Sequence, residues 1–481
     1  MKNENEEKII RPKKIKLSRC YRLFLFFVMI NIDCTIDISS GILSSSAKEI
    51  KNQLKLNDAK FGSFGTAISL GRIISSFLFF FLNKKVNRKY FLITIVSFHS
   101  LFLFFFKFTN NFHILIVLRC LQGLTHTSPS IYVPIWINQF GLKEYKTVQI
   151  TSIQLFQAIG KLLGHFIIII IGFENWKNGF IISGIYLLIL AFCCLISNEN
   201  YFSKTLYPKR IEASYNDDKN EKIRLSDTVF EEHEINIETN YCLDLSKLLQ
   251  SPLYVISLIC RSIIRGLITC LHYWFSDFLR NILKGEKPIT ITISYGIICF
   301  TGPFGGIIAN AILKPCFGNY ESRKASWPLV ILQITASIFA ISIGLAGITN
   351  SLITICLITI LFLTFNSSVI ALVQGILISC VDKNLSATGF AFANAFTQIL
   401  TAGPTPMIYG IINDRYEEKY PWIAMCCIMS LNLIAVPLLI YLAILRNKKF
   451  DVEKNEKKEN ERELVDVNDL DEDINKSMEN F

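Results

Sequence analysis

The sequence predicts an all-α membrane protein with twelve transmembrane helices, arranged as two pseudo-symmetric six-helix bundles. Of the 481 residues, 51% are hydrophobic and only 18% are charged, whereas a soluble domain usually carries about 25% charged residues. The charges gather before residue 21, between 198 and 248, and after residue 445. Between these regions, apolar blocks repeatedly reach the roughly 20 residues that one spanning helix needs, and no alternating pattern suggests a β-barrel.

A long polar stretch divides the apolar blocks into two sets of six. We expect spans at 21–45, 61–82, 90–108, 112–138, 147–171 and 178–197, and then at 252–280, 290–313, 327–347, 351–380, 386–412 and 421–445. The expected units are an N-terminal tail (1–20), a first bundle (21–197), a linker (198–250), a second bundle (251–445) and an acidic tail (446–481). Linker and tail are expected to be disordered, except for an amphipathic helix near Leu243–Leu249.

Basic residues near the helix ends predict the orientation, because cytoplasmic loops are enriched in Lys and Arg. They occur in the N-terminal tail, in the second and eighth connections and after the last span, which all lie on one face. The connections 108–111 and 348–350, on the opposite face, are short and poor in charge, although the first and seventh carry several lysines. We therefore expect a multi-pass protein with both termini cytoplasmic, in a plasma membrane or a lysosome-like or vacuole-like membrane.

Several classes of function lack a signature in this sequence. The fourteen cysteines fall almost entirely in apolar segments, with no CxxC pair and no metal-ligand spacing, so we expect neither a metal nor a cofactor. Nucleic-acid binding would need a contiguous basic face. A lipid-modifying enzyme would need a convergent catalytic set, and none is present. We expect no catalytic residues and a monomeric protein.

Ionisable residues inside spans are costly and usually face a bundle interior or a wet cavity. Here they recur at spacings of four and seven, which places each set on one face of its helix. The residues are Asp33 and Asp37 in 21–45, Arg72 in 61–82, Arg119 and His126 in 112–138, Lys161 and His165 in 147–171, and Arg261, Arg265 and His272 in 252–280. They either line a cavity or pair with one another to hold the halves together.

Cations outnumber carboxylates in these spans, and a low dielectric strengthens such a surplus. An anionic substrate is the natural counter-charge, since guanidinium groups suit phosphate and carboxylate. His126 has an ordinary pKa near 6.5, so it is the first candidate for proton coupling, followed by Asp33 and Asp37.

Glycine and proline residues interrupt corresponding spans of the two halves, as they do near gates in transporters. Gly160 and Gly164 form a motif that permits close helix approach. The candidate gating residues are Gly302 and Pro303 in 290–313, and Gly403, Pro404 and Pro406 in 386–412. Plain packing is an equally acceptable explanation for each glycine.

Several short segments also resemble motifs of one transporter family in order and spacing. They are Asn87-Arg88-Lys89, Arg119–Gly123 with Pro134, Trp176, Tyr254–Trp274, Ile298–Gly302 with Gly305, Ala387-Thr388, and Pro406–Gly410 with Asp414. Together they make the chain similar to the major facilitator superfamily, and within it to the spinster-like lipid transporters. The resemblance covers nearly all of the chain from the first to the eleventh span.

Some positions depart from that family's pattern. The family's acidic residue in the fourth helix falls at His126, and the motif Asp-Ala-Gly-Ser-Pro of its eleventh helix becomes Ala402 to Pro406. Either Asp33 or Asp37 corresponds to the aspartate of its first helix, whereas Arg119 carries over cleanly. The resemblance therefore does not support a coupling carboxylate in 112–138, although a titratable group remains there.

The resemblance implies secondary active transport by alternating access, and spinster substrates are lysophospholipids and sphingosine phosphate. We therefore expect transport of an organic anion, a lysophospholipid or related phosphate-bearing lipid, with proton coupling. Arg119, Arg261, Arg265, Lys161 and Trp274 would bind substrate, while Asp33, Asp37 and His126 would carry protons.

Two other functions stay open. One is transport of a small polar metabolite such as a carboxylate, an amino acid or a sugar phosphate, and the other is a transporter-like sensor without net flux. A lipid carrier should have a cavity that opens sideways and ends in an apolar compartment. A metabolite carrier should have a closed, polar pocket.

Overall fold

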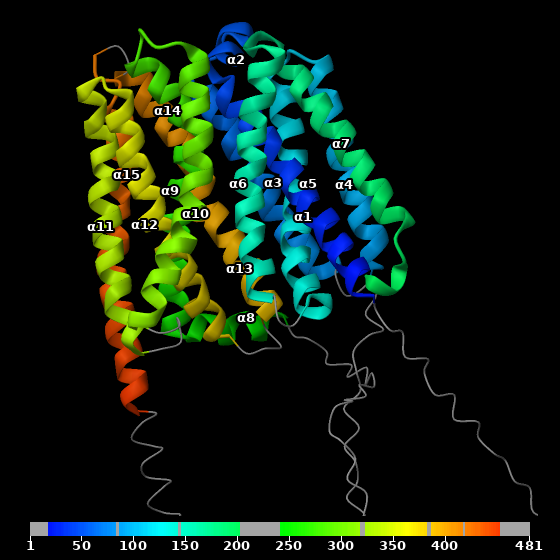
Figure 1. The fold of residues 1–481 in the computed structure, drawn as a ribbon, viewed down its shortest axis with the longest axis vertical. Helices are drawn as coiled ribbons and strands as arrows, with labels where there is room; N and C mark the ends of the chain where they lie inside the picture. The colour runs from blue at the N-terminus through cyan, green and yellow to red at the C-terminus, as the bar shows by residue number, and fades with distance from the viewer. Residues whose placement is uncertain are drawn as a thin grey trace, which may run out of the picture.

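The computed structural model of the chain describes residues 18–82, 86–142, 146–202, 241–317, 323–381, 386–416 and 419–452. Most of the predicted N-terminal tail, linker and acidic tail lies outside these residues, as do Lys84 and Lys85 of the second connection. The described chain is almost entirely helical (Figure 1).

Twelve segments form the predicted spans. Ten helices of the described chain are long and apolar enough to cross a membrane, and α5 and the interrupted eleventh span complete the set. The first six are α1 (Arg19–Ser45), α3 (Asp58–Leu82), α4 (Arg88–Phe105), α5 (Phe112–Phe140), α6 (Lys146–Ile171) and α7 (Trp176–Ile196). The second six are α9 (Pro252–Ile282), α10 (Pro288–Phe317), α11 (Ser326–Ala346), α12 (Leu352–Ser379), α13–η8–α14 (Ser386–Tyr416) and a last span (Ile423–Val452) that begins with α15 (Ile423–Ser430).

Figure 1 shows the two bundles side by side, with the first on the right and the second on the left. Helix α3 packs against α14 and α6 against α10, so these two seams join the bundles. The beginning of α1 and the end of the last span lie on one face, together with the short helix α8 (Tyr241–Gln250). We call this the α8 face, and the opposite face, which carries α2 (Ala47–Leu54), the α2 face.

Three features refine the predicted elements. The amphipathic helix in front of the second bundle is confirmed as α8. The polar segment after the first span was expected to be a connection, but it forms α2, which begins shortly after α1 and ends at Leu54, followed by Lys55 in the left-handed region. The eleventh span is broken by the π-helical η8 (Gln398–Ala402), because Pro404 and Pro406 lack the N–H groups that would continue a regular α-helix.

Glycines bring helices of the first bundle into backbone contact. A Cβ atom on Gly71 of α3 would lie 1.9 Å from the carbonyl oxygen of Cys120 in α5, and one on Gly160 of α6 would lie 2.1 Å from that of Cys34 in α1. The close approach predicted for Gly160 and Gly164 is therefore confirmed. These contacts fix the helices that bear Arg72, His126 and Asp37 relative to one another.

Ion pairs and hydrogen bonds join the two bundles at the α2 face. Lys51 Nζ lies 2.5 Å from Asp58 Oδ1 and 2.9 Å from Asp277 Oδ2, so one lysine bridges α3 and α9. Arg280 of α9 donates to both carboxylate oxygens of Glu49 at 2.8 and 2.9 Å. Asp414 accepts from the backbone N–H of Asp58 at 2.8 Å, at the start of α3. The α2 face is thus closed by polar contacts between the bundles.

Lys51 stays charged in this arrangement. Burial alone would lower the pKa of its ammonium group, but the carboxylates of Asp277 and Asp58 outweigh burial and raise the pKa above its ordinary value. The side chain is only 11% exposed, so its charge is compensated by these two carboxylates rather than by bulk water.

We predict that Gly71→Ala destabilises the first bundle, because its new methyl group would overlap the Cys120 carbonyl. Overpacking of this kind typically costs about 1–3 kcal/mol. Thermal unfolding of the detergent-solubilised protein measures the effect. Gly285→Ala is the matched control, since nothing lies within 4 Å of the added atom. Equal unfolding temperatures for the two variants would show that the α3–α5 contact yields easily.

We predict that Lys51→Met loosens the α2 face, because Asp58 and Asp277 would then face each other without a counter-charge. In vesicles with the α2 face outside, a membrane-impermeant maleimide should label the cavity residue Cys299 at least about tenfold faster, corresponding to about 1.4 kcal/mol.

Lys48→Met is the control for this experiment, since Lys48 is exposed on the same short helix. Adding Asp277→Asn to Lys51→Met should restore slow labelling, because it removes one of the two repelling charges. Similar labelling rates in Lys51→Met and Lys48→Met would contradict the proposed closure.

Candidate functional site

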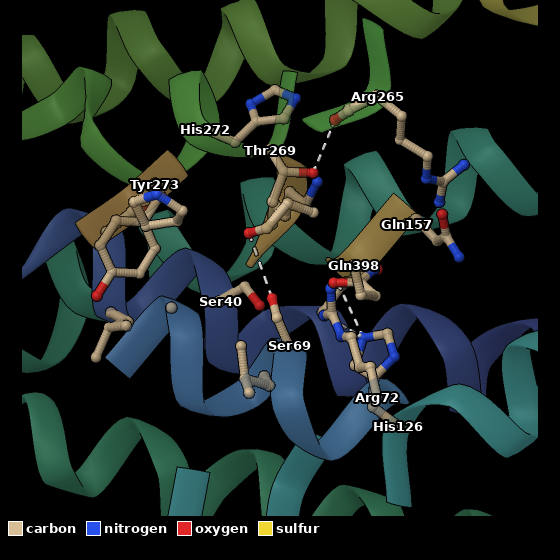
Figure 2. A pocket seen from close by; sticks show the side chains of 18 of the residues that line it. Ser40, Ser69, Arg72, His126, Gln157, Arg265, Thr269, His272, Tyr273 and Gln398 are labelled. Atoms are coloured by element: carbon tan, nitrogen blue, oxygen red, sulfur yellow. Dashed lines mark hydrogen bonds and ion pairs between the residues drawn. The ribbon is translucent and has the colours of Figure 1, made fainter. Parts of the chain in front are cut away.

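A cavity of about 160 Å³ lies between the two bundles and is lined by both of them. Its walls come from α1, α3, α5 and α6 of the first bundle and from α9, α10, α13, η8 and α14 of the second. Figure 2 shows Arg72 and His126 on one side of the cavity and Arg265, Thr269 and His272 on the other. The predicted residues that line it are Asp37, Arg119, His126, Lys161, Arg265 and Pro406, together with Arg72, His165 and His272.

The lining has a surplus of positive charge. Four cationic side chains, Arg72, Arg119, Lys161 and Arg265, face one carboxylate, Asp37. With the three lining histidines counted as neutral, three positive charges are left uncompensated among the described lining residues. Because charges interact strongly in a protein interior, this imbalance favours an anionic occupant.

Lys161 and Arg265 lie on opposite bundles and have no counter-ion in contact. Lys161 belongs to α6 and Arg265 to α9, and both are half-buried. Within the residues that the structure describes, neither side chain takes part in a hydrogen bond or ion pair. An anion between these two cations would contact both halves of the protein.

Asp37, His126 and Arg72 form a chain of contacts in the first bundle. Arg72 Nη2 lies 3.0 Å from His126 Nε2, and Asp37 Oδ1 lies 3.5 Å from the same nitrogen. Arginine can only donate, so His126 Nε2 accepts this hydrogen bond and its lone pair faces Arg72. A proton on Nε2 would break that contact and allow donation to Asp37 instead.

Asp33 lies directly behind this chain. Its carboxylate accepts from Ser130 at 2.5 Å and from Gln157 at 2.7 Å, and it does not line the cavity. Because Gln157 lines the cavity and also holds Asp33, a group that binds Gln157 would disturb Asp33. The two predicted aspartates thus have different surroundings, one beside a histidine and one beside neutral donors.

Arg119 is the most deeply buried cation of the lining, at 1% exposure. Its guanidinium lies between the rings of Phe106 and Phe180, at 5.0 and 5.3 Å from their centroids. It donates to Gln122 Oε1 at 2.9 Å, while its Nε and Nη2 have no hydrogen-bond partner in the described chain. Aromatic faces stabilise a cation without neutralising it, so Arg119 adds positive potential to the cavity.

Two predicted binding residues lie outside the lining. Arg261 is fully buried and donates to Ala393 O, Thr397 Oγ1 and Asn394 Oδ1, so it fastens α9 to α13. Trp274 donates to Pro406 O at 2.9 Å and stacks on Tyr409. Both side chains hold helices together in this conformation and do not reach the cavity.

Only some of the predicted gating residues lie at the cavity. Pro406 lines the cavity, and Gly403 O and Ala402 O accept hydrogen bonds from Thr66 and Ser69 of the first bundle. Pro406 lacks the N–H that would bond the carbonyl of Ala402 four residues earlier, so that carbonyl is available to Ser69. Gly302 instead packs against Leu363 of α12, away from the cavity, and Pro303 is also absent from its lining.

Neutral polar residues of the site escaped the sequence analysis. Gln157, Gln398, Asn394 and Tyr295 all line the cavity, but single uncharged polar residues are common in spans and carry little signal. The one available signal was helical spacing, because Gln157 precedes Lys161 by four residues and therefore shares its face.

Comparison with known proteins agrees with this architecture. Residues 32–404 match the Major Facilitator Superfamily. The sphingosine-1-phosphate transporter SPNS2 of Danio rerio is 22% identical over 392 residues, covering 77% of this chain and 72% of that protein. Protein spinster homolog 1 of Xenopus laevis is 21% identical, with 78% and 69% covered.

Solved structures share the fold. A crystal structure of a bacterial homolog of the human lysosomal transporter spinster superposes with a TM-score of 0.64 at 14% identity, covering 90% of this chain and 98% of that one. A D-xylose–proton symporter superposes with a TM-score of 0.65 at 13% identity, with 88% and 97% covered. The chain is therefore a spinster-like membrane transporter, not an enzyme, and belongs to the major facilitator superfamily.

Proposed function

We propose that this transporter carries a polar organic anion by alternating access, with a proton as the coupled ion. The observation that carries the proposal is the pair Lys161 and Arg265, two cations on opposite bundles that face one cavity without a counter-ion in contact among the described residues. An anion held by both would draw the bundles together, which is how binding energy drives a change between two states.

The closed α2 face supports access from the α8 face. Lys51, Glu49 and Asp414 tie the bundles together on the α2 side of the cavity. Basic residues near the α8 face, among them Arg22, Arg446 and Lys449, support a cytoplasmic assignment for that face. In this state the cavity would exchange solute with the cytoplasm.

The Asp37–His126–Arg72 chain supports proton coupling. An anion that engaged Arg72 would withdraw the hydrogen bond that Arg72 gives to His126 Nε2. The freed nitrogen would then take up a proton and donate to Asp37, which lies 3.5 Å away. Binding of the anion would thus raise the affinity of His126 for a proton, and protonation of His126 would raise the affinity for the anion in turn.

The polarity of the lining favours a small metabolite over a lipid. Most lining residues carry nitrogen or oxygen in the side chain. The exceptions are Leu43, Phe64, Gly65, Ile68, Cys299, Ala402 and Pro406. Phe64, Gly65 and Ile68 of α3 give one apolar wall, while the charged and amide groups elsewhere in the lining suit a polar solute. The seam beside that wall is closed, since a Cβ on Gly62 would lie 2.5 Å from the carbonyl oxygen of Pro406.

A lysophospholipid or related phosphate-bearing lipid is the second candidate. The Danio rerio relative is named as a sphingosine-1-phosphate transporter, and Phe64 and Ile68 are an apolar surface that the end of a tail could contact. The head group would occupy the same cations in either case. A sensor without flux would share the binding site but not the transport.

We predict that proteoliposomes containing the protein take up glycerol 3-phosphate, and that Arg265→Ala lowers this uptake at least about tenfold, corresponding to about 1.4 kcal/mol. Lysophosphatidate, which adds an acyl chain to the same head group, distinguishes the lipid from the metabolite. Arg265→Lys should retain part of the activity because it keeps the charge.

Arg415→Ala serves as the control, since Arg415 is exposed on α14 away from the cavity. Uptake of lysophosphatidate alone would select the lipid candidate. Binding without uptake would identify a sensor, and transport that is indifferent to Arg265→Ala would remove this residue from the site.

We also predict that an inward proton gradient accelerates uptake, and that Asp37→Asn abolishes this acceleration while exchange of labelled for unlabelled substrate continues. The reason is that Asp37 is the acceptor for a protonated His126, whereas exchange requires no net proton movement. Asp451→Asn is the control, because Asp451 pairs with Arg323 at the surface. Gradient-driven uptake that persists in Asp37→Asn would place the coupling group elsewhere.

A further inference from the structure

A second polar cluster lies in the same cavity, one to two helical turns nearer the α2 face than Lys161 and Arg265. It contains His165 of α6, His272 of α9, and Tyr295 and Cys299 of α10, all in the lining. His165 follows Lys161 by four residues and His272 follows Arg265 by seven. At 1.5 Å per residue, the histidines are displaced by roughly 6 to 10 Å along the helix axes.

The surroundings of His165 determine which of its nitrogens carries the hydrogen. Its Nδ1 lies 2.9 Å from the carbonyl oxygen of Lys161. A carbonyl can only accept, so Nδ1 is the donor and the neutral ring leaves Nε2 as a bare acceptor. This nitrogen is buried and has no hydrogen-bond partner in the described chain.

Nδ1 of His272 also carries the hydrogen, but its partner is a hydroxyl instead of a carbonyl. The Tyr295 hydroxyl lies 2.9 Å from the backbone carbonyl of His272 and 2.9 Å from its Nδ1. The hydroxyl donates its one hydrogen to the carbonyl, so its lone pair accepts from Nδ1–H. Cys299 Sγ lies 3.5 Å from the same nitrogen and acts as a second, weaker acceptor. Figure 2 shows the His272 ring at the cavity. Its Nε2 is therefore a second acceptor, and no described residue donates to it.

Two unpartnered acceptor nitrogens at one end of a cavity favour a ligand that brings hydrogen-bond donors. A buried acceptor without a partner costs free energy, and a hydroxyl or amino group of a ligand would supply the missing donor. An acyl chain would leave both nitrogens unpaired. A metal ion fits poorly, since no group of three potential ligands among the described His, Cys, Asp and Glu residues is arranged to hold one.

We propose that the cavity recognises its substrate at two unlike ends, so that the transported solute is an organic anion bearing hydroxyl or amino groups. The anionic group lies between Lys161 and Arg265, and a donor group roughly 6 to 10 Å away binds Nε2 of His165 and His272. This inference rests on the proposed anion site and extends it from charge to the rest of the molecule. A hydroxylated metabolite and a lipid head group share this chemistry.

The test compares two phosphates that differ mainly in their hydroxyl groups. Glucose 6-phosphate carries hydroxyls around its ring, whereas cyclohexylmethyl phosphate keeps a six-membered ring and the phosphate but has no hydroxyl. We expect the purified protein to bind the hydroxylated probe at least about tenfold more tightly in calorimetry, because a site built around hydrogen bonds rejects an analogue that lacks them. Lysophosphatidate, measured in parallel, shows whether a lipid head group meets the same requirement.

His272→Leu and His165→Leu should each reduce this preference towards equality while leaving affinity for cyclohexylmethyl phosphate nearly unchanged. Either variant suffices if the other does not fold, as judged by thermal unfolding. His113→Leu is the control, because His113 is exposed at the start of α5. Arg265→Ala should weaken both probes alike.

The outcomes separate the two levels of the proposal. Equal affinity of the native protein for both probes, or a preference that survives both histidine variants, would overturn the donor-seeking end and leave the anion site in place. Failure of all three phosphates to bind would overturn the anion site itself, and the donor-seeking end with it.

Discussion

The cost of burying charge governs this structure. A guanidinium or ammonium group inside a membrane protein is costly unless it is paired or hydrated, yet four such groups line one cavity with a single carboxylate. The bundles hold Arg72, Lys161 and Arg265 around a shared cavity, while Arg119 lies between two aromatic rings at its edge. Helices α1, α3, α5, α6 and α9 all contribute to this cavity, and the missing negative charge remains for a substrate to supply.

The contacts that close the α2 face are of a kind that opens at low cost. Lys51, Asp58, Asp277, Arg280 and Glu49 are polar groups at the end of the bundle, so water can replace each partner when the bundles part. An apolar closure would expose hydrophobic surface instead. Close backbone contacts through glycine occur within a bundle, as between Gly71 and Cys120, and also across the seam, as between Gly62 and Pro406. Opening the α2 face therefore has to separate packed backbone as well as exchange these polar partners.

The spans could be predicted because hydrocarbon thickness fixes their length, and Gly403, Pro404 and Pro406 marked the interruption of the eleventh span. Helix α2 could not be predicted, because it has too few apolar residues, and the prolines do not by themselves specify a π-helical turn at Gln398–Ala402. Spacing correctly placed Lys161 with His165 and Arg265 with His272 in one cavity. The same spacing rule wrongly grouped Arg261 with Arg265. A spacing of four residues brings two side chains to neighbouring positions on one helix but does not say which neighbouring helix each one faces.

Selectivity in such a cavity needs more than positive charge, since two cations attract any anion of suitable size. The histidines supply a second criterion because their Nδ1 atoms are committed to a carbonyl and a hydroxyl. That commitment leaves Nε2 as an acceptor on each ring, and the same nitrogen of His126 already accepts from Arg72. Two unpartnered acceptor nitrogens, on His165 and His272, thus lie beside a cationic site, and a solute satisfies both features only if it brings a negative charge and hydrogen-bond donors. The tautomers set by these contacts, rather than the histidines as such, would make the cavity selective.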